Sequence, residues 1–152
     1  RETVANYVNF IMETEYFRLL PKFSYSLKEQ KVNPKKIIAV DNGLRNRISF
    51  RFSSDEGKLA ENLVGGLLAR KDGEIYYWQG EREVDFVVRG GGIGLEAVNV
   101  SYGASIEKRE IESLLEFSQK NKKAKLILIT RNAEKKEKNI KFIPLWKWLL
   151  KN

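Results

Sequence analysis

The stretch EIYYWQGEREVDFVVRGGGIGLEAVNVSY, from Glu74 to Tyr102, contains three short runs with the composition of β-strands. Gln79-Gly80 and a run of glycines separate them, and both separators favour turns. We therefore predict an antiparallel meander whose strands cover residues 75–78, 83–89 and 95–102.

Asp85 interrupts the otherwise apolar run 84–88 in the second of these strands. A carboxylate in a half-buried strand costs free energy unless it is paired, hydrogen-bonded or bound to a metal. Any chemistry of this chain is therefore expected around Asp85.

The composition limits the possible chemistry. A chain of 152 residues can build one core, or one core with a small appended element. It contains no cysteine and no histidine, which excludes disulfides, thiolate metal sites and imidazole catalysis. Carboxylate, lysine or tyrosine chemistry remains, or a hard cation such as Mg²⁺. There is no long apolar run and no signal-like N-terminus, so we expect a cytoplasmic protein.

The net charge of +8 suggests a polyanionic partner, because lysine and arginine facing phosphates release counterions. DNA is the expected partner. The alternative is a basic face that only solvates the protein.

The first fifty residues resemble the second half of a winged helix-turn-helix. A helix over 3–13 is predicted from apolar residues at near-helical spacing, and two strands, 15–20 and 36–40, flank a basic connection, 28–35. In that interpretation the helix is the recognition helix and the connection is the wing. The expected nucleic-acid contacts are Arg1, Lys28, Lys31, Lys35, Lys36, Arg45 and Arg47.

The alternative is a helix and hairpin that pack on the following domain. The chain starts inside the helical pattern, so we expect a fragment lacking its upstream part.

A domain boundary is predicted near residue 50, with one domain over 1–50 and a second over 51–152. Asp41-Asn42-Gly43 indicates a turn, and 44–52 is interpreted as a basic linker. Ser53 and Glu56 have capping-box spacing and begin a helix predicted to reach about Lys71. Gly65-Gly66 in its middle predicts close approach of another backbone.

The remainder of the chain predicts a helix over 105–121, a buried, central parallel strand over 125–130, a charged loop over 131–139 and a strand over 140–143. Pro144 opens a last helix, in which Trp146 and Trp148 are expected to fill the core. The order predicts an α/β fold, a mixed sheet with helices on both faces. Gly57-Lys58 lacks the rest of a Walker A motif, and the glycine run from Gly90 precedes a strand, so no nucleotide cofactor is expected.

The order helix, three-strand antiparallel meander, helix, strand resembles the restriction-endonuclease-like PD-(D/E)XK superfamily, which includes archaeal Holliday-junction resolvases. Its members carry a helix Glu, a strand Asp and a Glu-x-Lys or Gln-x-Lys on the next strand. A closer resemblance, covering essentially the whole chain, is to the C-terminal domain of archaeal AAA+ ATPases, a domain of unknown function that follows the ATPase module and a winged helix. It rests on LPKFSYSLKEQ, NPKKIIAVDNGLRNRISFRFS, EGKLAENLV, EIYYWQGEREVDFVV and IPLWKWLL.

By this resemblance Glu61 matches the helix Glu and Asp85 the strand Asp. Asn99 stands where the family has Glu or Gln, and Ser101 stands where an active nuclease has its lysine. Glu96 points to the other face of the strand and joins the site only if a bulge shifts the register. The resemblance thus implies degenerate catalytic positions Glu61, Asp85, Asn99 and Ser101. If the site were active, Mg²⁺ would bind Asp85, Glu61 and Glu96.

The expected function is DNA binding, or positioning of an upstream ATPase module on a partner, without catalysis in this chain. One alternative is an active Mg²⁺-dependent DNA endonuclease, and another is a protein-interaction module. For Glu61 and Asp85 a purely structural role is also open, with Arg82, Arg89 or Lys58 neutralising them.

Overall fold

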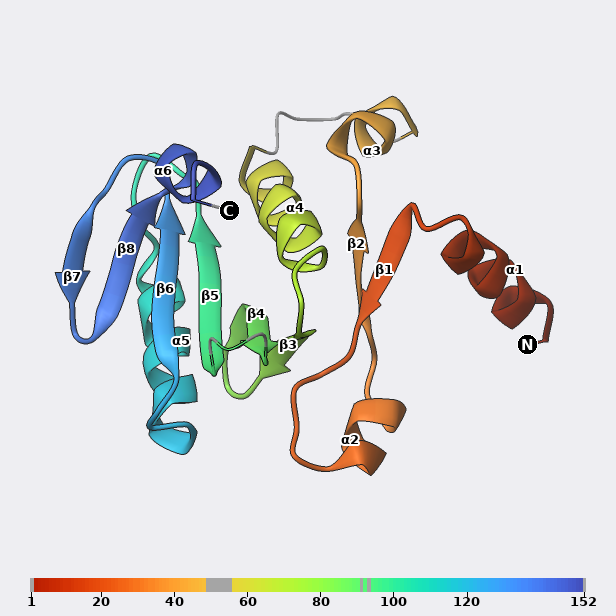
Figure 1. Ribbon diagram of the computed structural model, residues 1–152, viewed down its shortest axis with the longest axis horizontal. Helices are drawn as coiled ribbons and strands as arrows, with labels where there is room; N and C mark the ends of the chain where they lie inside the picture. The colour runs from red at the N-terminus through yellow and green to blue at the C-terminus, as the bar shows by residue number, and fades with distance from the viewer. Residues whose placement is uncertain (1, 49–55, 91, 93, 152) are drawn as a thin grey trace.

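The computed structural model describes residues 2–48, 56–90, 92 and 94–151 (Figure 1). Within them the helices are α1 (Glu2–Glu13), α2 (Leu27–Val32), α3 (Asn42–Ile48), α4 (Glu56–Leu68), α5 (Lys108–Lys120) and α6 (Leu145–Leu149). The strands are β1 (Phe17–Leu20), β2 (Lys36–Ala39), β3 (Glu74–Gln79), β4 (Glu83–Arg89), β5 (Leu95–Ser101), β6 (Lys125–Thr130), β7 (Lys135–Glu137) and β8 (Ile140–Pro144).

The main sheet has six strands in the order β3-β4-β5-β6-β8-β7. β3, β4 and β5 pair antiparallel, which confirms the predicted meander. β6 lies parallel to both β5 and β8, which confirms the central position expected for its continuous apolar run. The fold is therefore a mixed α/β sheet.

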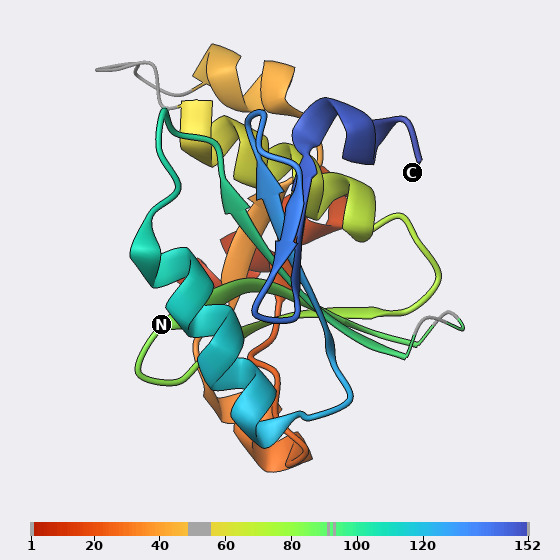
Figure 2. The same ribbon diagram turned by 90° about the vertical axis from the view of Figure 1, so that its left-hand side faces the viewer.

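Helices cover both faces of this sheet (Figure 2). On one face α5 buries Leu114 and Phe117 against strand residues such as Ala97. On the other face α4 and α6 bury Val64 and Trp148. Alternate residues of β5 supply the two cores, because successive side chains of a strand point to opposite faces.

The predicted wing is wrong. The connection between β1 and β2 contains α2, and the two strands pair antiparallel beyond it. The Oγ of Ser26 caps α2 by accepting a hydrogen bond from the Glu29 N–H. Ser26 and Glu29 have the capping-box spacing, and this local signal outweighs the basic composition that suggested a loop.

The β1–β2 sheet packs against the main domain. Leu20 and Ile38 belong to the same buried cluster as Val64 and Phe86. The Tyr77 N–H donates to the Pro21 carbonyl, and the Phe23 N–H donates to the Tyr77 carbonyl. The division of the chain near residue 50 stays a prediction, but one hydrophobic core contains residues from both sides of it.

The glycine pair in α4 allows the close approach that the sequence predicted. A Cβ on Gly65 would lie 2.7 Å from the Phe86 ring, and one on Gly66 would lie 3.5 Å from the Val40 carbonyl oxygen. Both distances place α4 directly on β2 and β4.

Two other segments differ from their predicted structure. α3 begins at Asn42, so the predicted turn and the first part of the predicted linker are helical, whereas Ser53 lies outside the described residues. In the predicted loop 131–139, β7 forms and pairs antiparallel with β8.

The helices at the two ends of the chain expose apolar side chains. In α6, Trp148 is buried as predicted, but Trp146 is 58% exposed, so only one of the two tryptophans fills the core. The predicted helix at the N-terminus is confirmed as α1, and its Val4, Val8 and Ile11 are exposed. No helix within the described residues is long and apolar enough to cross a membrane.

Candidate functional site

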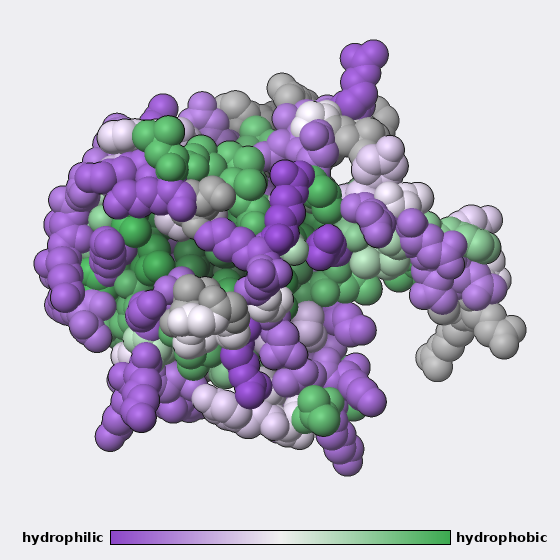
Figure 3. Space-filling model, in the orientation of Figure 1, coloured by the Kyte–Doolittle hydropathy of each residue, from purple (hydrophilic) through white to green (hydrophobic). Residues whose placement is uncertain are grey.

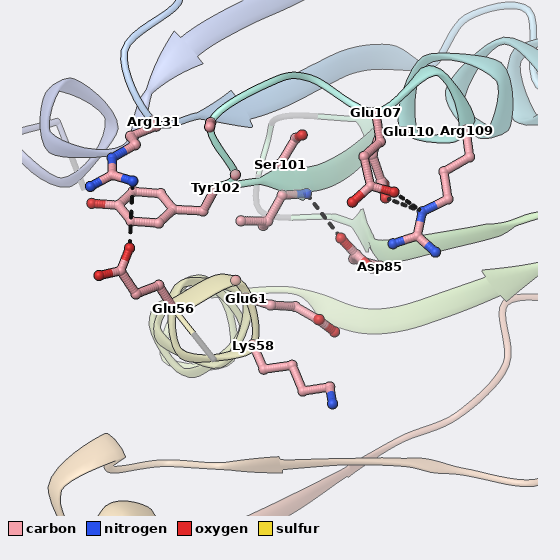
Figure 4. Close-up of a pocket in the computed structure, with 14 residues that line it drawn as sticks. Glu56, Lys58, Glu61, Asp85, Ser101, Tyr102, Glu107, Arg109, Glu110 and Arg131 are labelled. Carbon is pink, nitrogen blue, oxygen red and sulfur yellow. Dashed lines mark hydrogen bonds and ion pairs between the residues drawn. The ribbon is translucent and has the colours of Figure 1, made fainter. Parts of the chain in front are cut away.

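A cavity of about 510 Å³ lies between α4, the N-terminal end of α5 and the ends of β4 and β5. Glu61, Asp85 and Ser101 line it, together with Glu110 and Arg109 from α5. Figure 4 shows Glu61 extending from α4 toward Asp85, whereas Lys58 extends away from it. The structure therefore brings together two of the predicted carboxylates and the serine.

Asp85 lies at a β-bulge. Tyr76 pairs with Val87 and Trp78 with Val84, so Asp85 and Phe86 together face the single residue Tyr77. A bulge of this kind redirects the side chain of its strand. It turns Asp85 toward α4 and β2, where its charge is neutralised.

The regular backbone pairing of β4 with β5 ends at Phe86 and Val98. Beyond that point, hydrogen bonds between side chains and backbone hold the two strands together. The Asp85 N–H donates to Asn99 Oδ1 at 2.9 Å, and the Val100 N–H donates to Asp85 Oδ2 at 2.9 Å. These two bonds replace backbone ladder bonds. One oxygen of Asp85 thus has a structural role in the sheet.

The other oxygen of Asp85 faces Lys36, at the start of β2. Lys36 Nζ lies 3.6 Å from Asp85 Oδ1, 2.7 Å from Glu61 Oε1 and 2.7 Å from Glu83 Oε1. These four residues, Lys36, Glu61, Glu83 and Asp85, are called the Asp85 site below. A basic side chain therefore pairs with Glu61 and Asp85, as the structural alternative predicted. That side chain is Lys36, whereas the sequence suggested Arg82, Arg89 or Lys58.

The ionisation of the Asp85 site reflects its burial. Desolvation alone would lower the pKa of Lys36, but the carboxylates of Asp85, Glu61 and Glu83 together raise that pKa well above its ordinary value. Burial, assisted by the nearby charge of Glu61, raises the pKa of Asp85 to about 7, although Lys36 opposes the shift. Lys36 is thus held as a cation, and the carboxylates share its charge.

Lys36 was predicted to contact nucleic acid, and its ammonium is instead turned inward. Its side chain is 22% exposed, and its Nζ lies 5.6 Å from the centroid of the Phe86 ring. A signal for this was present in the sequence, because Lys36 shares its strand face with Ile38, which is buried. Glu83, which sequence reasoning did not assign to the site, has no comparable signal.

Asn99 is fully buried, on the α5 face together with Ala97, as strand parity predicted. Its Nδ2 donates to Glu110 Oε2 at 2.8 Å and to Ser113 Oγ at 2.7 Å, while its Oδ1 accepts from Asp85. Burial also raises the pKa of Glu110. The carboxamide oxygen and amino group are thus both used inside the fold.

Glu96 lies away from this cavity. It pairs with Lys125 at 3.3 Å and lines a second cavity with it. The pairing of β5 with β6 runs without a shift from Glu96 to Ser101, so the bulge that would turn Glu96 toward Asp85 does not occur in β5. The bulge is in β4 instead.

The donor set does not fit a divalent cation. Asp85 and Glu61 are both ion-paired with Lys36, Asp85 Oδ2 accepts from Val100, and Asn99 presents its amino group to Glu110. Within the described residues, no three acidic side chains are grouped to hold a metal ion. We therefore derive no chemical step through Mg²⁺.

The remaining residues predicted to contact nucleic acid do not form one surface. Lys28 and Lys31 lie on α2 with Lys35 just before β2, whereas Arg47 lies on α3, and Figure 1 shows these helices at opposite ends of β2. Arg1 and the side chain of Arg45 lie outside the described residues.

Comparison with known proteins places the chain in a family without an assigned activity. A family model described as "Domain of unknown function (DUF4143)" matches residues 56–148. "Uncharacterized protein MJ1544" of Methanocaldococcus jannaschii is 31% identical over 166 residues, an alignment that covers 99% of this chain and 36% of that protein. No solved structure matches the chain. Because the matched residues make up more than half of the sequence, the chain belongs to the family described as Domain of unknown function (DUF4143).

Proposed function

We propose that this chain is a DNA-binding module with a restriction-endonuclease-like fold that does not cleave DNA, and that it serves as the C-terminal domain of an archaeal-type AAA+ ATPase. The observation that carries the proposal is the position of Lys36 among Glu61, Glu83 and Asp85. Metal-dependent phosphodiester cleavage needs carboxylates that are available to a hard cation. Here an internal ammonium occupies that place.

The arrangement of the fold supports the PD-(D/E)XK part of the proposal. α4, the meander of β3 to β5, α5 and the parallel β6 follow one another in the order that the resemblance implies. Glu61 on the helix and Asp85 on the second meander strand line the same cavity. The positions of a nuclease centre would then be retained while its third strand supplies Asn99 and Ser101.

An ATPase context is supported by the length of the archaeal relative. This chain spans 36% of that protein, which leaves room there for a further module. The chain itself carries no phosphate-binding glycine motif, so ATP hydrolysis would belong to the other module.

DNA is favoured over a protein partner by charge. The net charge of +8 provides sequence-independent attraction to phosphates. The carboxylates of the Asp85 site repel phosphates only weakly, because Lys36 neutralises part of their negative charge. The function proposed is therefore retention of DNA near an ATPase.

Fluorescence anisotropy with labelled duplex and four-way-junction DNA tests the proposal. We expect binding in EDTA that weakens steeply between roughly 50 and 200 mM salt, and intact DNA after incubation with Mg²⁺ or Mn²⁺. The matched control is Asp85→Ala, which should leave the DNA equally intact.

Two outcomes would contradict this proposal. Mg²⁺-dependent cleavage that Asp85→Ala abolishes would establish the endonuclease alternative. Absent binding, or binding insensitive to salt, would favour a protein-interaction module in its place.

A further inference from the structure

The positive charge of the chain is concentrated in one segment. Residues 120–141 contain nine of its 28 lysine and arginine residues and only two of its 20 acidic residues. This segment therefore carries a net charge of +7, against +8 for the whole chain. It runs from the last residue of α5 through β6 and β7 to the first two residues of β8.

Folding places three of these lysines on one face of the sheet. Lys136 of β7 and Lys141 of β8 are directly paired, and Lys141 is paired on its other side with Ile127 of β6. Lys125 precedes Ile127 by two residues and so shares its face. Lys125, Lys136 and Lys141 are called the lysine surface below.

The lysine surface lines a cavity of about 730 Å³ whose lining also includes Ile127 and Ile143. Figure 2 shows the β7–β8 hairpin at the front of the molecule without a helix over it. In Figure 3 hydrophilic side chains form the left-hand edge of the molecule, beside a hydrophobic area. The lysine stems can therefore lie on apolar surface while their ammonium groups stay exposed.

The charges of this surface are largely without partners. Lys136 and Lys141 form no ion pair with any residue that the structure describes, and both are exposed. Lys125 pairs with Glu96 but remains 62% exposed. Like charges directly opposite each other in a sheet destabilise it. A polyanion bound across Lys136 and Lys141 would remove that repulsion.

The geometry suits an extended phosphate backbone better than a single anion. Neighbouring strands are about 4.8 Å apart, so the three lysines on three successive strands form a row and do not converge on one point. The aromatic residue that lines the cavity, Phe142, is buried and offers no face for base stacking. Contacts here would be independent of base sequence.

We propose that the lysine surface binds the phosphate backbone of double-stranded DNA. This inference rests on the proposed function for the identity of the ligand. It assigns the contact to the β6–β8–β7 edge of the sheet, far from the N-terminal residues that the sequence suggested (Figure 1).

Lysines on an edge strand also have a role that needs no ligand, since they hinder pairing with the edge of another molecule. That role predicts greater self-association when the lysines are neutralised, with DNA affinity unchanged. The experiment must therefore measure both quantities.

We would compare the full chain, Lys136→Gln/Lys141→Gln and the matched control Lys28→Gln/Lys31→Gln by anisotropy with duplex DNA at several salt concentrations. Both variants lose two exposed positive charges. For the first we expect roughly tenfold weaker binding at low salt and a salt slope smaller by about two. The control should change the affinity less than about twofold. Thermal unfolding and sedimentation check folding and self-association.

The outcomes separate the two proposals. If the unchanged chain binds DNA and the control variant loses more affinity than Lys136→Gln/Lys141→Gln, the lysine surface is wrong and DNA binding stands. Equal affinity of all three proteins, with self-association only in the lysine-surface variant, also overturns the inference. If the unchanged chain does not bind duplex DNA, both proposals fail.

Discussion

The Asp85 site and the lysine surface differ in how their charged side chains are paired. At the Asp85 site, β2, α4 and β4 bring one ammonium among three carboxylates, and the side chains other than the exposed Glu83 are largely removed from water. At the lysine surface, charges of one sign face each other in solvent. Charge removed from water must be neutralised inside the fold, whereas exposed charge can be left for a partner. The comparison separates what stabilises this domain from what could bind to it.

The largest expected effect comes from removing the cation of the Asp85 site. Lys36→Met keeps the stem beside Phe86 but leaves Glu61, Glu83 and Asp85 facing one another. We expect a loss of about 2 to 3 kcal/mol in the free energy of unfolding at pH 7.5, because partly buried carboxylates would lack their partner. Urea unfolding measures it. The control Lys31→Met, on exposed α2, should change it by less than about 0.5 kcal/mol; equal losses would mean that the network does not stabilise the fold.

A somewhat smaller loss is expected from restoring a carboxylate at the third strand. In Asn99→Asp an oxygen would replace the amino group that now donates to Glu110 and Ser113. We expect a loss of about 2 kcal/mol, since a buried charge would face another carboxylate. The exposed Asn132→Asp is the control in the same unfolding assay. If added Mg²⁺ recovered the stability of Asn99→Asp, the carboxylates would be available to a cation after all.

The pH dependence of stability should distinguish Asp85 from its neutral isostere. Because the pKa of Asp85 in the folded protein is about 7, above its ordinary value of 3.8, the folded state binds more protons between these values. Its contribution to stability therefore falls as the pH rises from about 4 to about 7, by at most about 1.4 kcal/mol per pH unit. Asp85→Asn cannot titrate and lacks this fall.

Urea unfolding of both proteins in EDTA at pH 4.5, 6 and 7.5 measures the difference. The stability of Asp85→Asn relative to the unchanged chain should increase over this range. Parallel curves would show that Asp85 is already ionised at pH 4.5. Glu110, whose pKa is also raised, acts electrostatically on Asp85, so the difference between the two proteins includes any change in the ionisation of Glu110.

The smallest effect is expected at the lysine surface. Lys136→Glu would place an opposite charge directly across from Lys141. We expect a gain of about 0.5 kcal/mol at low salt that largely disappears at 1 M salt. Lys138→Glu, in the turn between β7 and β8, makes the same charge change without a cross-strand partner. A gain equal to that of this control would show that the facing lysines do not repel each other measurably.

Sequence reasoning succeeded where a local pattern decides the structure. Alternating and continuous apolar runs located β3 to β6, strand parity placed Asn99 on the same face as Ala97, and Gly65-Gly66 indicated close approach of another backbone. Composition misled in the segment 28–35, because the basic residues indicate a loop whereas Ser26 caps α2 there.

The partner of Asp85 could not be found from sequence spacing. Lys36 lies 25 residues before Glu61 and 49 before Asp85, so only tertiary packing brings the three together. The bulge in β4 was equally hidden, because the run from Val84 to Val88 has the composition of a regular strand. The residue types of the site were therefore predictable, and the source of its positive charge was not.

The glycine contact in α4 and the Lys36 network both cross the bounds of the family match, which begins at residue 56. A protein shortened to residues 56–148 would lose Leu20 and Ile38 from the core and uncover the Phe86 ring. It would also retain Glu61, Glu83 and Asp85 without their ammonium. The smallest unit expected to fold by itself is thus longer than the family match and must include the β1–β2 hairpin.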